Sequence, residues 1–167
     1  MDKLILINKM KEIFCKVPYG VEHTLRVLAY AEEIMQYENI TQYQREVITI
    51  TAIMHDIGAI EALRKYGDMG GEHQEIEGPN VARRILKELR LNPELIERVC
   101  FIIGNHHTPS KIDGIDFQIQ WEADLIDNIK YTNTHKDTES LLQLIKDNVK
   151  TSTGTNIAYR ELMVSRL

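Results

Sequence analysis

The 167-residue sequence predicts an all-α protein, folded as a single compact helical bundle. Apolar residues recur at three- and four-residue steps along nearly the whole chain, which is the spacing of one face of an α-helix. Capping residues, prolines and glycines stand where these stretches would begin and end. The length suits one domain, and we find no internal repeat, low-complexity tract or long linker. We therefore expect residues 1–167 to form one domain.

The first part of the chain is expected to form three helices. The first ends before Pro18, and its apolar residues are Leu4, Ile7, Met10, Ile13 and Phe14. The second covers about residues 20–37. The third opens with a capping-box pattern of Thr41 and Gln44 and stops near Gly58. Its run ITITAI is rich in β-branched residues, as a strand would be, but its length, cap and neighbours favour a helix. Since this helix is apolar on most sides, we expect it in the middle of the bundle.

The rest of the chain is expected to be helical apart from two longer loops. Residues 66–73 contain three glycines and are expected to form the first loop. The next helix carries Ile76, Val81, Ile85, Leu86 and Leu89. Asn92 is expected to cap the following helix, with Pro93 at its first position. The turn-rich residues 105–116 then lead to helices over about 117–132, 138–150 and 156–166.

Composition restricts the partners and the cellular setting. The formal net charge of −5 argues against binding of a nucleic-acid polymer, which needs a basic surface. A small phosphorylated molecule stays open, because one Arg or Lys is enough to bind it. No stretch approaches the ~18 apolar residues of a membrane span, and the N-terminus lacks a signal-peptide core. Cys15 and Cys100 both lie in apolar stretches and are expected to be reduced core residues. We therefore expect a cytoplasmic protein without membrane association.

The first candidate for a functional role is the doublet His55-Asp56. It follows an apolar helix segment, TAIM, where burying an imidazole and a carboxylate without partners is costly. The two side chains either bond to each other as a structural pair or bind a cation. The doublet alone favours the structural pair.

Two more positions change that balance. His23 lies 32 residues before His55, a separation that suits two antiparallel helices. Asp124 shares a helix face with apolar residues and so also requires a partner; Asp127 is the alternative carboxylate on that helix. Imidazole and carboxylate groups that converge in a bundle core form metal sites suited to Fe, Mn, Co, Ni or Zn.

These residues resemble the HD-domain superfamily of metal-dependent phosphohydrolases. The resemblance rests on a first His, a His-Asp doublet in its HDIG form at 55–58, and a distant Asp, and it covers about residues 18–132. It implies an all-α bundle of the HD-domain type, followed here by C-terminal helices over 138–166. It also implies that His23, His55, Asp56 and Asp124 hold one divalent ion.

A subset of the family holds further metals through extra histidines, and in it the doublet Asp bridges two ions. Here the candidates are His73, His106 and His107, with Asp56 as the bridge. His73 lies five residues before Gly78, whereas related patterns often place the His four before that glycine, where this chain has Gln74. The alternative for His106-His107 is a solvated loop doublet. We therefore expect one or two divalent ions per chain.

Other polar residues are candidates for supporting roles. Asp56 would orient a metal-activated water, and Glu72 or Asp68 could protonate the leaving group, although both also suit solvated loop carboxylates. Arg26 and Lys111 could bind a substrate phosphate. The alternative for Arg26 is a surface pair with Glu22.

Three other kinds of residue are not expected to take part in chemistry. His135 is expected to be exposed and without a role. Trp121 and the tyrosines show no regular spacing that indicates base stacking, so we expect them to pack or to line a pocket.

The sequence thus predicts a metal-dependent phosphohydrolase that acts on a small phosphorylated molecule, for which a nucleotide is a candidate. Whether it cleaves monoesters or diesters is open, as are the metal and the oligomeric state. One alternative is an HD-type di-iron oxygenase that uses the same positions. The second is a module without catalysis that binds a metal or a nucleotide.

Overall fold

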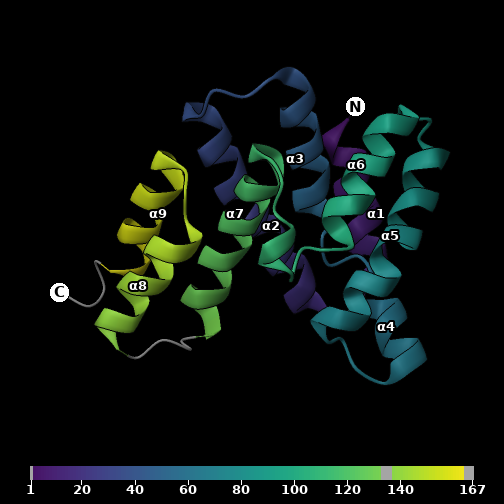
Figure 1. Cartoon of the computed structure of the whole chain (residues 1–167). Helices are drawn as coiled ribbons and strands as arrows, with labels where there is room; N and C mark the ends of the chain where they lie inside the picture. Colours follow the sequence, from purple (N-terminus) through teal and green to yellow (C-terminus); the bar gives the residue numbers. More distant parts are fainter. Residues whose placement is uncertain (1, 133–136, 164–167) are drawn as a thin grey trace.

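The computed structural model describes residues 2–132 and 137–163, and this part is all-α, as predicted (Figure 1). The helices are α1 (Lys3–Ile13), α2 (Pro18–Tyr37), α3 (Gln42–Met54), α4 (Ala59–Tyr66), α5 (Gly71–Glu88), α6 (Pro93–Ile103), η1, a short 3₁₀ helix (Pro109–Lys111), α7 (Ile115–Thr132), α8 (Thr138–Asn148) and α9 (Ser152–Leu162). No strand occurs in these described ranges.

Local signals set several helix starts. The Thr41 side chain accepts a bond from the backbone N–H of Gln44, and the Gln44 side chain accepts one from that of Thr41, so the predicted capping box is present. Asn92 caps α6, and Pro93 is its first residue, as predicted. These caps satisfy backbone donors that have no partner inside the helix.

The region around the predicted glycine loop is more helical than the sequence indicated. Residues 59–66 form α4, which ends at Gly67 with a φ of +83°. The loop is shorter than predicted, because α5 already begins at Gly71. Glu72 and His73 therefore lie in the first turn of a helix, and this fixes the directions of their side chains.

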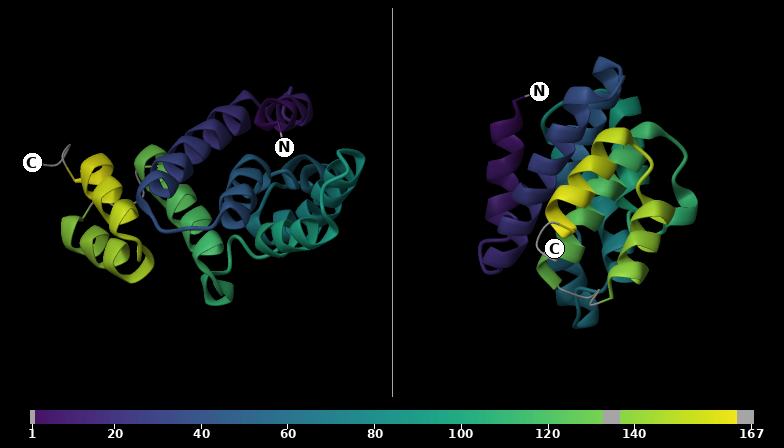
Figure 2. Two further views of the ribbon diagram at one scale, coloured as in Figure 1. Left: turned by 90° about the horizontal axis from the view of Figure 1, so that it is seen from above. Right: turned by 90° about the vertical axis from the view of Figure 1, so that its left-hand side faces the viewer.

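The middle of the bundle consists of α2, α3 and α7, and α3 carries the run of buried residues that predicted this position (Figure 2). Helices α4, α5 and α6 pack on one another beside it, and α1 packs on α3. One connected apolar core extends from Leu6 to Leu162. No helix in the described ranges combines the length and the apolar character that a membrane crossing requires.

Three apolar predictions were wrong in detail. Cys15 is exposed, because α1 ends at Ile13 and the helical spacing does not continue into the turn; Cys100 is buried as expected. Leu4 and Ile76 are exposed, although helical spacing placed them on apolar faces. Leu4 lies in the first turn of α1 and Ile76 in the second turn of α5, where neighbouring helices do not cover every apolar position.

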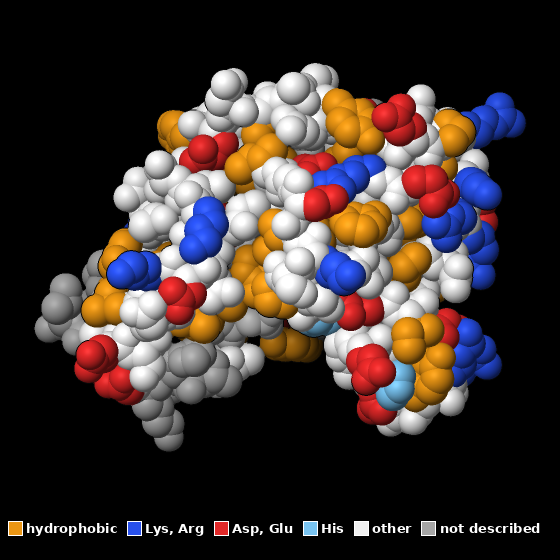
Figure 3. Space-filling view, in the orientation of Figure 1, with side chains coloured by type: hydrophobic (Ala, Val, Ile, Leu, Met, Phe, Trp, Pro, Cys, Tyr) orange, Lys and Arg blue, Asp and Glu red, His pale blue; other side chains and the backbone are white. Residues whose placement is uncertain are grey.

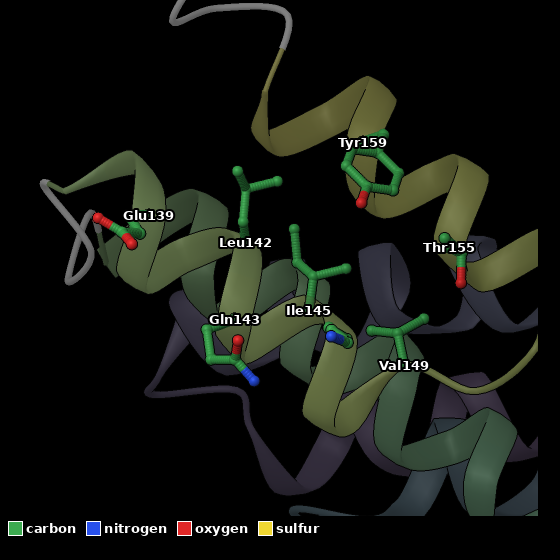
Figure 4. Close-up of a pocket in the computed structure, with 8 residues that line it drawn as sticks. Glu139, Leu142, Gln143, Ile145, Val149, Thr155 and Tyr159 are labelled. Carbon is green, nitrogen blue, oxygen red and sulfur yellow. The ribbon is translucent and has the colours of Figure 1, made fainter.

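The C-terminal helices are fastened to α7 by a buried carboxylate. Glu122 accepts hydrogen bonds from the backbone N–H groups of Lys150 and Thr151 and from the Thr151 hydroxyl. Between α8 and α9 lies a shallow groove of about 460 Å³ whose floor includes Leu142, Ile145 and Val149 (Figure 4). This groove contains none of the predicted site residues.

Candidate metal centre

Three helices bring four of the predicted residues together. His23 lies in α2, His55 and Asp56 follow α3, and Asp124 lies in α7. His23 Nε2 is 3.1 Å from Asp124 Oδ1, 3.1 Å from His55 Nε2 and 3.5 Å from Asp56 Oδ2. His55 Nε2 is 3.5 Å from Asp124 Oδ1 and 3.6 Å from Asp56 Oδ2.

The orientation of the His23 and His55 rings is set by the hydrogen bond that each Nδ1 atom makes. His55 Nδ1 lies 3.1 Å from the carbonyl oxygen of Ala52, and His23 Nδ1 lies 2.7 Å from Asp127 Oδ2. Because these oxygens only accept, both rings donate from Nδ1–H. In the neutral ring Nε2 then carries the lone pair, and in both histidines it is directed into the cluster.

This cluster requires a cation. Two lone-pair nitrogens and two carboxylates face one another, and His55 is fully buried, so water reaches only part of the cluster and does not compensate all of their repulsion. Without a metal, a proton can take that place. Although burial favours neutral His23, hydrogen bonds to Asp124 and Asp127 raise its pKa to about 10. Imidazole nitrogens and carboxylate oxygens suit a divalent transition metal, so the donor set fits the predicted ion.

The two carboxylates of the cluster stay ionised. Burial alone would raise the pKa of Asp56, but the nearby His55 and the hydrogen bond from His106 lower it. In the same way, hydrogen bonds from His23 and His55 outweigh burial and lower the pKa of Asp124. The Asp56 side chain keeps 19% of its surface exposed, so the cluster is open to solvent on that side.

A second group shares Asp56 with the first. His106 Nε2 is 3.2 Å from Asp56 Oδ1, while Asp56 Oδ2 faces His23 and His55. His106 donates from Nδ1–H to the carbonyl of Ile103, 2.7 Å away. Its Nε2, which carries a lone pair in the neutral ring and a proton in the imidazolium, is thereby directed toward Asp56. One ligand atom each of Asp56, His106 and His107 lies within 4.8 Å of the others. The structure thus brings His106 and His107 to a place where they could hold a second ion.

Comparison with family models gives one result. The HD-domain model matches residues 20–147, which is most of the chain. The chain belongs to the HD-domain family. Comparisons with curated proteins and with solved structures gave no match. HD domains are in general metal-dependent hydrolases, and the His/Asp groups described above could hold the metal.

His73 does not join either group of this HD domain, contrary to the sequence-based prediction. Its Nδ1 lies 2.9 Å from Asp68 Oδ1, and its ring stacks on Tyr66 at a centroid distance of 4.1 Å. The reason is the direction of α5. Gly71 lies against the ring of His107, and residue 73 is rotated by roughly 200° from that face.

The sequence reading missed Glu75, which lies on the α5 face that meets the site. Its carboxylate accepts the backbone N–H of His107 at 2.9 Å and the Thr108 hydroxyl at 3.0 Å. It therefore fixes the turn that carries the histidine doublet. Its helical spacing from Gly71 could have signalled this role only if the start of α5 had been known.

Asp127 accepts a hydrogen bond from His23 and does not take the place of Asp124 as a candidate metal ligand. The side chain is completely buried, and it binds His23 Nδ1 as well as Arg26 Nε and Nη2, at 2.7 and 3.0 Å. Arg26 thus pairs with Asp127, and not with Glu22 as in the alternative given for it above. On the same helix, Asn128 Nδ2 donates to Asp124 Oδ1 at 3.0 Å.

The remaining candidates lie outside the two groups. Glu72 is exposed on α5, and Lys111 is exposed at the end of η1. Asp68 binds His73 and the backbone of Gly70, so its carboxylate is engaged away from Asp56. The geometry therefore does not support Glu72 or Asp68 as the leaving-group acid. His135 lies outside the described residues.

Proposed function

We propose that this HD domain is a metal-dependent phosphohydrolase that acts on a small phosphorylated molecule. The observation that supports this most directly is the carboxylate of Asp56, which faces one ligand group with each oxygen and keeps an exposed edge. A carboxylate in this position can serve two ions and still contact a substrate. The net charge of −5 supports a small substrate over a nucleic-acid polymer, and the two free cysteines agree with a cytoplasmic setting.

The chain's residues would divide the work as follows. His23, His55, Asp56 and Asp124 hold one divalent ion, and Asp56, His106 and His107 hold the second. Divalent ions supply charge neutralisation for phosphoryl oxygens and lower the pKa of bound water. Because its pKa is lowered, Asp56 acts as an ionised acceptor that orients the attacking water and does not donate a proton. Glu75 holds His107 in place through the backbone.

The test combines metal analysis with turnover. Protein purified without chelators is analysed for metal, then loaded separately with Fe, Mn, Ni, Co or Zn and assayed for phosphate release from monoesters and diesters. We expect release with at least one metal and its loss in Asp56→Ala. Oxygen uptake with iron but no phosphate release would favour the di-iron oxygenase, and metal-dependent stability without any turnover would favour a binding module.

A further inference from the structure

Beside the metal centre, α2 and α7 present an exposed aromatic and cationic edge made of Tyr19, Arg26 and Tyr131. Tyr19 lies one turn before His23, and the two rings are nearly parallel, with centroids 6.3 Å apart and planes 10° apart. Tyr19 keeps 57% of its surface exposed. A flat ring is thus available to a ligand directly next to a metal-site histidine.

Arg26 connects this ring to a second one. Its guanidinium lies over the Tyr131 ring at 3.8 Å, and Tyr131 is itself 50% exposed. Asp127 occupies Nε and Nη2 of Arg26, while Nη1 makes no hydrogen bond within the described residues. Because Asp127 and Tyr131 fix the guanidinium, its Nη1–H donors are held in place without being used.

The opposite side of the centre offers a poorer surface for a phosphorylated ligand. There His73 covers one face of the Tyr66 ring at 4.1 Å, and the exposed carboxylates of Asp68 and Glu72 supply negative charge. In space-filling view the molecule is notched between the lobe of α4 and the part that carries α8 and α9, with acidic side chains on the α4 side (Figure 3). A phosphate and its organic group are therefore better accepted along α2 and α7.

Aromatic side chains next to a phosphate site commonly bind the planar base of a nucleotide, since every base has a π-face that can stack on them. We propose that Tyr19 stacks on the base of a nucleotide whose phosphate reaches the metal groups, with Arg26 Nη1 donating to the same ligand. This inference rests on the proposed function and names its substrate class. It differs from the expectation that the tyrosines only pack or line a pocket, because Tyr19 becomes a specificity-determining residue.

The experiment compares two ligands that differ only by the base, adenosine 5′-monophosphate and ribose 5-phosphate. Binding to the metal-loaded protein is measured by calorimetry, and hydrolysis is measured in parallel. In Tyr19→Leu we expect Kd and KM for the nucleotide to rise about tenfold or more, with kcat and all values for ribose 5-phosphate within twofold of wild type. Tyr19→Phe keeps the ring and should match wild type.

Tyr37→Leu is the matched control, because Tyr37 is an exposed tyrosine on the same helix, roughly 27 Å farther along it. It should leave both ligands unaffected. The inference is overturned if wild type binds the nucleotide no better than ribose 5-phosphate, or if Tyr19→Leu weakens both equally. Base-selective binding without any hydrolysis would support the stacking role and contradict the proposed phosphohydrolase, so the two failures are distinguishable.

Discussion

At the scale of single residues, the metal centre depends on where the imidazole protons lie. His23, His55 and His106 each place Nδ1 against an oxygen, and each directs Nε2 toward Asp56 or Asp124. Two of these oxygens are backbone carbonyls from the preceding helical turn. The orientation of His55 and His106 is therefore set by local structure, whereas that of His23 depends on a side chain from another helix.

This difference makes Asp127 a sensitive position. In Asp127→Asn the acceptor of His23 Nδ1–H becomes a neutral amide, which lowers the basicity of Nε2 and loosens the pair with Arg26. We expect metal affinity to fall about 10- to 100-fold, as measured by titration of chelator-treated protein with Mn²⁺. Asp147→Asn, at an exposed position on α8, should bind as wild type. An affinity within twofold of wild type in Asp127→Asn would contradict the positioning role.

The histidines outside the first group can be separated by metal counting. Because His107 lies near Asp56 and His106 whereas His73 pairs with Asp68, His107→Ala should reduce the second metal equivalent and His73→Ala should not. Elemental analysis after loading with excess Mn²⁺ and desalting checks this. We expect wild-type content in His73→Ala. Loss of metal in that variant would show that the ring leaves Tyr66 and reaches the site.

At the scale of elements, the HDIG turn fits closely against the backbone of α5 because Gly58 has no side chain. A Cβ on Gly58 would lie 2.5 Å from the backbone nitrogen of Gly78 and 2.7 Å from the carbonyl oxygen of Gln74. The φ of Gly58 is −76°, so the glycine is needed for the close approach and not for its backbone angle. This contact places α5, and with it Glu75, against the turn that carries His106 and His107.

Gly58→Ala should therefore push α5 away from the metal centre. Backbone atoms cannot yield as a flexible side chain can, so we expect a loss of about 1–3 kcal/mol in the free energy of unfolding, measured by urea denaturation. Gly70→Ala is the control, since its Cβ would meet only the Asp68 side chain, and it should change stability by less than about 0.5 kcal/mol. Equal stability of the two variants would contradict this account of the glycine.

At the scale of the whole molecule, a metal ion bound at this cluster would join segments that are distant in the sequence. The candidate ligands lie in α2, in the turn after α3 and in α7, and His106 and His107 lie in the turn after α6. An ion that binds only the folded state stabilises it by about 2.7 kcal/mol when its concentration is a hundredfold above Kd. Such an ion would at the same time compensate the buried imidazole nitrogens and carboxylates that face one another in the cluster.

We accordingly expect chelation to lower the melting temperature. For a chain of this size, that free energy corresponds to a shift of about 5–10 °C, and the melting temperature should rise with added metal. Differential scanning calorimetry of the apo and metal-loaded protein measures the shift, and the same titration on Asp56→Ala should show a smaller one. Identical melting temperatures with and without metal would mean that the cluster does not bind it in the folded state.

Much of this protein follows from the sequence alone. The helical spacing, the capping box at Thr41 and the Pro93 start are local signals, and local backbone energetics decide them. The spacing of His23, His55, Asp56 and Asp124 also predicted their convergence, because polar groups on apolar helix faces must find partners in the core. For these four residues, their positions on apolar helix faces were enough to predict that they meet in the core.

Only the tertiary structure decided which neighbouring polar residues belong to the site. His73 and Glu75 are two residues apart, yet Glu75 meets the histidine doublet while His73 stacks on Tyr66. Which of the two meets the site depends on the rotation of α5 about its own axis, and residue spacing does not fix that rotation. The same holds for Arg26, whose partner Asp127 is 101 residues away. Such pairings depend on how helices cross, and packing of the whole core sets that angle.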